Sequence, residues 1–126
     1  MSARAVHRIV AGLGAFFLLC AAALHSVGYR GVVDALTGLP PDSIFRGALP
    51  GIWLFFSWHL VAFAVAVAWA ALRGPTSARP LVVFAALVCV IDALFVFSLA
   101  GVFIGSVVLT LAAICLVTGA AKWPAT

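Results

Sequence analysis

The last third of the chain is an almost continuous apolar run from Leu81 to Ala121. As one helix, these roughly 41 residues would be about 60 Å long, twice the ~30 Å hydrocarbon core of a bilayer. The run must therefore fold back on itself, and Ser98–Gly105 holds the glycines that a turn needs. We expect a third membrane span near residues 81–99 and a fourth near residues 102–121.

Two earlier apolar runs are each long enough for one crossing, Ile9–Val27 and Ile52–Leu72. The segment between them is broken by Gly, Pro, Asp and Arg. Within it, Pro40–Ser43 combines a helix stop with an N-cap, which predicts a short surface helix over Ile44–Leu49. At the end of the second run, Arg73–Pro75 has the cation, glycine and proline of a helix end.

Composition agrees with a membrane protein, because 67% of the residues are hydrophobic and only 8% are charged. A soluble domain of this size needs far more polar surface. The sequence thus predicts an all-α integral membrane protein, in which residues 1–126 form a single four-transmembrane-helix bundle. We expect up-down topology, with a short outer-loop helix between the first and second spans.

The positive charges indicate how the bundle is oriented. The net charge is +4, but the seven Lys and Arg residues are scattered near the ends of apolar runs, so no nucleic-acid-binding face is expected. If four helices alternate in direction, most of the Lys and Arg residues lie on the same side of the membrane. The first loop, on the other side, balances its two Arg with two Asp. By the positive-inside rule we expect both termini in the cytoplasm, in a cell membrane of the bacterial inner-membrane type. The residues on the cytoplasmic side are Arg4, Arg8, Arg73, Arg79 and Lys122.

One polar side chain from each span reaches the outer half of the bilayer. Counted at ~1.5 Å per residue, His59 lies about 20 Å from the cytoplasmic end of its span. Asp92 lies about 18 Å from the cytoplasmic end of its own span. Thr110 is also about 18 Å deep, and His25 is about 25 Å deep. A charged Asp at the centre of a membrane helix costs ~2.5–3.5 kcal/mol, so Asp92 must face the bundle and pair, or stay protonated.

We expect Asp92 to contact His59, directly or through water. The alternative is that Asp92 only joins helices, through Thr110, Ser57 or a backbone carbonyl. His59, Asp92 and His25 are the candidate catalytic residues. The expected pocket walls and polar contacts for a substrate are Trp58, Phe55, Phe56, Phe63, Phe95, Thr110 and Tyr29.

Three classes of function remain open. The first is an acid–base enzyme, an isomerase, cyclase or epoxide-opening enzyme, acting on a small lipophilic substrate. The second is a haem b protein with His25 and His59 as axial ligands. The third is a non-catalytic scaffold or transport subunit that forms a homo-oligomer through Ala62, Ala66 and Ala70.

No other metal or covalent-haem site is expected, because the three cysteines form no C-x-x-C motif. Trp53 is expected in the outer aromatic belt of the membrane, and Trp69 and Trp123 in the inner belt. His7, next to Arg8 at the cytoplasmic surface, is expected to be solvated.

The charge pattern makes a testable prediction about topology. In a variant without the native cysteines, Ser77→Cys should react with a membrane-impermeant thiol reagent only from the cytoplasmic side. Thr37→Cys should react only from the outside. Labelling of both positions from the same side would contradict the four-span arrangement.

Overall fold

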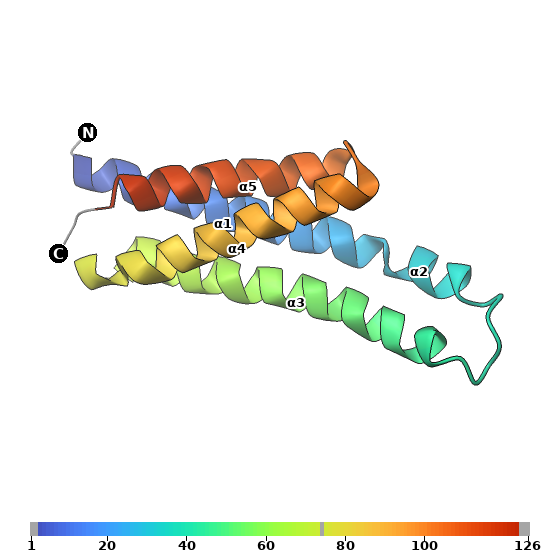
Figure 1. Ribbon diagram of the computed structural model, residues 1–126. Coiled ribbons are helices and arrows are strands. Elements are labelled where there is room, and N and C mark those ends of the chain that lie inside the picture. Colours follow the sequence, from blue (N-terminus) through green and yellow to red (C-terminus); the bar gives the residue numbers. More distant parts are fainter. Residues whose placement is uncertain (1–2, 74, 124–126) are drawn as a thin grey trace.

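The computed structural model describes residues 3–73 and 75–123, and almost all of them are helical (Figure 1). Four of the helices are long and apolar enough to cross a membrane, which fits the expected four-span integral membrane bundle. No strand occurs in the described ranges. The elements are α1 (Ala3–Val27), α2 (Tyr29–Ala35), α3 (Ile44–Arg73), the 3₁₀ helix η1 (Thr76–Ala78), α4 (Arg79–Ala100) and α5 (Ile104–Ala121).

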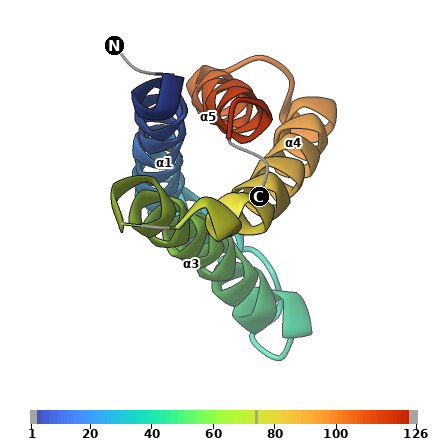
Figure 2. The same ribbon diagram turned by 90° about the vertical axis from the view of Figure 1, so that its left-hand side faces the viewer.

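The long helices alternate in direction, so both ends of the chain lie at the same end of the bundle (Figure 1). Seen end-on, their order around the bundle is α1, α5, α4 and α3 (Figure 2). α1 packs closely on α3 and α5, and α4 packs closely on α5, whereas α3 and α4 make far fewer contacts with each other. The seam between α3 and α4 is therefore the loosest side of the bundle.

Small residues bring α1 and α5 close together. A Cβ atom built on Gly119 would lie 3.0 Å from the backbone nitrogen of Ala11, and one on Gly14 would lie 2.7 Å from Cδ2 of Leu116. Close approach through small residues is the usual source of helix association in lipid, where the hydrophobic effect does not drive helices together. The largest fully buried apolar side chains of the bundle are Leu18, Leu60, Val67, Val82 and Leu116.

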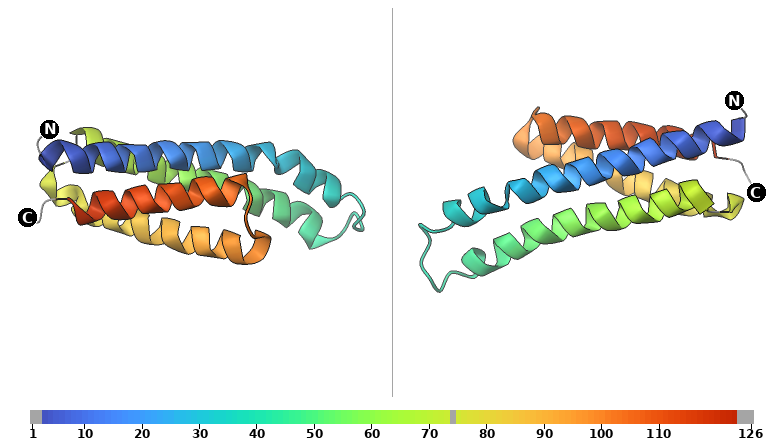
Figure 3. Two further views of the ribbon diagram at one scale, coloured as in Figure 1. Left: turned by 90° about the horizontal axis from the view of Figure 1, so that it is seen from above. Right: turned by 180° about the vertical axis from the view of Figure 1, so that it is seen from behind.

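The outer end of the bundle is stepped. α2 and the first turns of α3 extend beyond the α4–α5 turn, as the two views in Figure 3 show. α4 ends at Ala100, and Gly101 turns the chain with a φ of 68°, a conformation that glycine adopts without strain. Ser106 then caps α5, since its hydroxyl accepts a hydrogen bond from the Phe103 N–H and donates one to the Phe103 carbonyl. The predicted turn within Ser98–Gly105 is confirmed.

The first loop differs from the prediction. Ile44–Leu49 is helical, but it is the start of α3 and continues through Pro50, so the separate short helix of this loop is α2. A proline inside a spanning helix is tolerated because the backbone adjusts locally. Ile44 and Phe45 are 76% and 60% exposed and do not pack on the bundle.

The α3–α4 connection follows the prediction in part. α3 ends at Arg73 as expected, Gly74 lies outside the described residues, and Pro80 is in the first turn of α4. Thr76 and Ser77 belong to η1, and the residue before α4 is Ala78.

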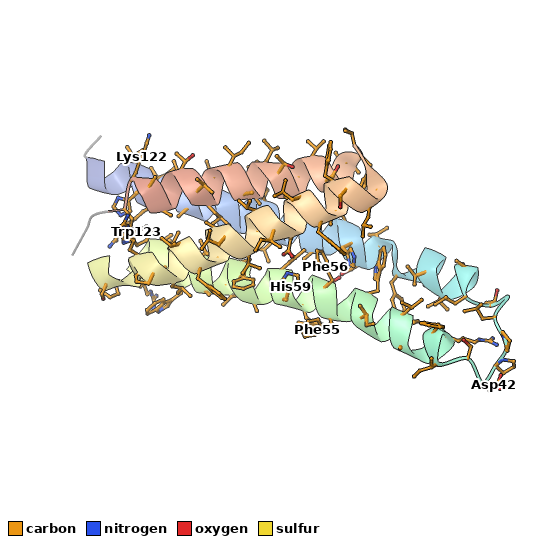
Figure 4. The ribbon with its side chains drawn as sticks, in the orientation of Figure 1. Asp42, Phe55, Phe56, His59, Lys122 and Trp123 are labelled. Atoms are coloured by element: carbon orange, nitrogen blue, oxygen red, sulfur yellow. The ribbon has the colours of Figure 1, made fainter. Side chains whose placement is uncertain are left out.

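Two residues at the cytoplasmic-facing end of the predicted topology are buried, contrary to expectation. His7 and Trp123 are each 3% exposed, and their ring centroids are 4.6 Å apart. The contact joins the start of α1 to the residues after α5, where Trp123 lies beside Lys122 (Figure 4). Ala70 is also fully buried inside the bundle, so the proposed oligomer face over Ala62, Ala66 and Ala70 is not one exposed surface.

The α1–α5 contact makes a prediction about stability. Gly119→Val should lower the free energy of unfolding by about 1–3 kcal/mol, because the added carbons meet the backbone of Ala11. Gly12→Val is the matched control, since a Cβ at Gly12 has no neighbour within 4 Å. Thermal unfolding in detergent measures both. Equal midpoints for the two variants would show that the contact is not tight.

Candidate intramembrane site

α3 and α4 are joined by a hydrogen bond between His59 and Asp92. Nε2 of His59 lies 2.8 Å from Oδ2 of Asp92, and the two side chains are 19% and 18% exposed. The sequence predicted that these residues lie at similar depth in the membrane, and the structure shows that their helices also turn them toward each other. Their role in catalysis stays a prediction.

The Asp92 carboxylate fixes how His59 presents its other nitrogen. When Asp92 is ionised, its carboxylate only accepts hydrogen bonds, so Nε2 of His59 then carries the hydrogen and donates it. Nδ1 has no hydrogen-bonding partner in the described part of the chain. Within that part no fully buried side-chain nitrogen or oxygen lacks a partner, so Nδ1 is not sealed inside the protein. His59 thus keeps one nitrogen within reach of a ligand.

Aromatic rings surround the His59 imidazole. The edge-on rings of Phe56 and Phe63 lie 4.7 Å and 5.9 Å from it, between centroids. Phe55 is 72% exposed, but it lies one helical turn before His59, and the centroids of their two rings are 6.4 Å apart. Phe56 and Phe63 thus flank the imidazole edge-on, with the more exposed Phe55 nearby. Their part in binding a substrate stays a prediction.

His25 forms a second polar cluster near the outer end of α1. Its Nδ1 lies 3.0 Å from Oγ of Ser57, and its ring stacks on Trp53 at 4.0 Å with an interplanar angle of 16°. The indole N–H of Trp53 donates to the His25 carbonyl oxygen at 2.7 Å. The first two contacts hold the imidazole in one orientation, and the third ties the indole of Trp53 to the backbone of His25.

Two adjoining pockets, of about 380 and 490 Å³, lie beside His25 at the stepped outer end; together we call them the outer pocket. They are formed by α1, α3, α4 and the start of α5. Neither is lined by His59 or Asp92, but Phe56 links the two places, because its ring is also 4.8 Å from the His25 ring. The residues that line both pockets are His25, Trp53, Phe56, Val96 and Phe103.

The other predicted contacts are spread over the molecule. Phe95 lines the outer pocket, although 59% of it is exposed. Trp58 is 69% exposed and lines a groove on the outward face of α3 instead. The Thr110 hydroxyl donates to the carbonyl of Ser106 in its own helix, so it does not contact Asp92. Tyr29 is half-buried at the start of α2 and lines neither half of the outer pocket.

Sequence reasoning missed Trp53 and Ser57. Trp53 was expected only in the outer aromatic belt, and Ser57 only as an alternative partner of Asp92. The available signal was depth, since Ser57 lies about 22 Å above Leu72 and so nearer the level of His25 than His59 does. Trp53 and Ser57 are also four residues apart, which places them on one face of α3.

The residues present do not favour a haem held by two histidines. Nε2 of His59 is bonded to Asp92, and Phe56 packs against both imidazoles, where the porphyrin would have to lie. The described part of the chain also has no group of three or more His, Cys, Asp or Glu side chains placed to hold a metal ion.

The His59–Asp92 contact makes a prediction that can be measured on stability alone. Asp92→Asn and His59→Gln should each destabilise the protein, while the double variant should lose less than the sum of the two. We expect a coupling energy of about 0.5–3 kcal/mol from a double-mutant cycle in detergent. Strictly additive losses would mean that the two side chains act independently.

The chain was also compared with known proteins. No family model, no curated protein and no solved structure matches it. Its function is therefore inferred from the site itself.

Proposed function

We propose that this integral membrane protein is an acid–base enzyme, of the isomerase type, which acts on a small lipophilic molecule within the bilayer. The observation that carries the proposal is the 2.8 Å hydrogen bond from His59 to Asp92, which leaves Nδ1 of His59 within reach. An ionisable residue inside a spanning segment is expensive and is a functional-site hypothesis by default.

The geometry supports a base that is oriented by a carboxylate. Asp92 accepts the Nε2 hydrogen, so the lone pair of His59 is on Nδ1, where it can take a proton from a substrate. When His59 becomes an imidazolium, the nearby carboxylate stabilises the charge, and the apolar surroundings strengthen that attraction. Phe56 and Phe63 exclude water from two sides of the ring.

The α3–α4 seam suggests how the substrate enters. These neighbouring helices make few contacts apart from the polar pair, and the rings beside the pair are hydrocarbon. A lipophilic molecule can approach between the helices from the bilayer without crossing a polar surface. With both termini in the cytoplasm, as the charges indicate, the pair would lie in the outer half of a cell membrane.

Proton transfer can be tested without knowing the substrate. Purified protein in nanodiscs, incubated in D₂O with a lipid extract of its host membrane, should incorporate deuterium at carbon into a lipophilic species. Mass spectrometry would detect the label. Asp92→Asn and His59→Gln should each lower the rate at least tenfold, because both remove the oriented base.

Thr110→Val is the matched control, since it removes a polar group at similar depth that bonds only within α5. It should exchange deuterium like the unmodified protein. If no species gains deuterium, or if both site variants exchange it at the unmodified rate, the proposed function is wrong.

A further inference from the structure

The Ser57 hydroxyl differs from other hydroxyls in the spanning helices. Ser26 and Thr110 each donate to the carbonyl four residues earlier, at 2.8 Å, which is the usual solution for a hydroxyl in a membrane helix. Ser57 makes no such bond. It is 6% exposed, and its one partner among the described residues is Nδ1 of His25, at 3.0 Å.

This difference determines which nitrogen of His25 carries the hydrogen. If Nδ1 donated to Ser57, the serine hydroxyl would be a buried donor without an acceptor, which costs about 1–3 kcal/mol. The hydroxyl must therefore donate to Nδ1, and the hydrogen of the neutral imidazole lies on Nε2. Nε2 has no partner in the described chain and is not fully buried. His25 thus offers one oriented N–H donor.

The Nε2–H donor of His25 belongs to a pocket whose lining is otherwise almost entirely apolar. His25 lines both parts of the outer pocket, and the other polar side-chain atom there, Nε1 of Trp53, already donates to a backbone carbonyl. No lining side chain in either part offers a free acceptor. The pocket therefore fits a hydrocarbon body with one hydrogen-bond acceptor. An alcohol fits less well, because its own hydroxyl hydrogen would find no acceptor.

We propose that the outer pocket binds a lipophilic carbonyl compound, a ketone or ester, whose oxygen accepts a hydrogen bond from Nε2 of His25. A carbonyl oxygen accepts strongly and brings no donor of its own. The stacked Trp53 and the bonded Ser57 hold the imidazole in place, so little freedom is lost when the compound binds.

This inference deepens the proposed function by naming its substrate class, and it rests on that function only for the chemistry. Nδ1 of His59 would take a proton from the carbon next to the carbonyl. The C–H electron pair then forms a C=C bond, while the carbonyl π pair moves to the oxygen, which His25 stabilises. In a carbonyl compound with a C=C bond between its β and γ carbons the product of this step is a dienolate, and return of the proton to the γ carbon gives the conjugated isomer without any co-reactant. Phe56 packs against both imidazoles, so a compound that contacts both takes the place of its ring.

The test uses 2-tridecanone as the probe and tridecane as its matched hydrocarbon. Both are added to the protein in detergent, and the shift of the thermal unfolding midpoint with concentration gives an apparent affinity. We expect the ketone to bind more tightly than the alkane. His25→Phe keeps the ring stacked on Trp53 but removes the donor, so it should reduce the ketone affinity about tenfold and leave the alkane unchanged.

Two further variants separate the possible outcomes. Ser57→Ala should also weaken ketone binding, because Nδ1 can then hold the hydrogen, and it provides the answer if His25→Phe does not fold. Asp92→Asn should keep the ketone preference even though it loses deuterium exchange. Absence of a ketone preference in the unmodified protein, or its persistence in His25→Phe and Ser57→Ala, would overturn the inference. Loss of the preference in Asp92→Asn alone would place the carbonyl at the other site and also overturn it.

Discussion

The hydrogen bond between His59 and Asp92 joins α3 to α4 and so closes the most loosely packed side of the bundle. In a bilayer there is no water to satisfy a carboxylate, so Asp92 must find its partner within the protein. It finds that partner on α3, the helix that α4 contacts least. Packing is weakest at this seam, and the polar bond supplies a specific link there. Among the described residues it is the one side-chain hydrogen bond between the two helices.

The remaining contacts make that link possible. α1 lies against both α3 and α5, and the close approach of Gly14 and Gly119 to the facing helices fixes α5 on α1. α5 in turn carries α4, which it joins through the Gly101 turn. α3 and α4 thus meet mainly because the other three helix–helix contacts of the bundle hold them in place.

The spans and the His59–Asp92 pair could be predicted because both follow from strong energetic requirements. Apolar length sets the number of crossings, and the cost of an unpaired charge in lipid leaves Asp92 few options. The contact of His25 with Ser57 could not be predicted in the same way. It depends on how far each helix rotates about its axis, and the sequence of α3, apolar on nearly every face, does not reveal that rotation. The burial of His7 against Trp123 was missed because His7 stands beside Arg8, which favoured a solvated position. Pro50, inside α3, made the first turns of that helix read as a separate short helix.

The phenyl ring of Phe56 has a consequence for the membrane as a whole. Protons cross a bilayer along connected hydrogen-bonding groups, and His25 and His59 would be two steps of such a path. The ring packs against both imidazoles, and hydrocarbon passes no protons. Each imidazole is instead bonded to its own partner, Ser57 or Asp92. The side chains therefore keep two proton-carrying groups close together without connecting them, so they do not by themselves form a leak that would dissipate an ion gradient.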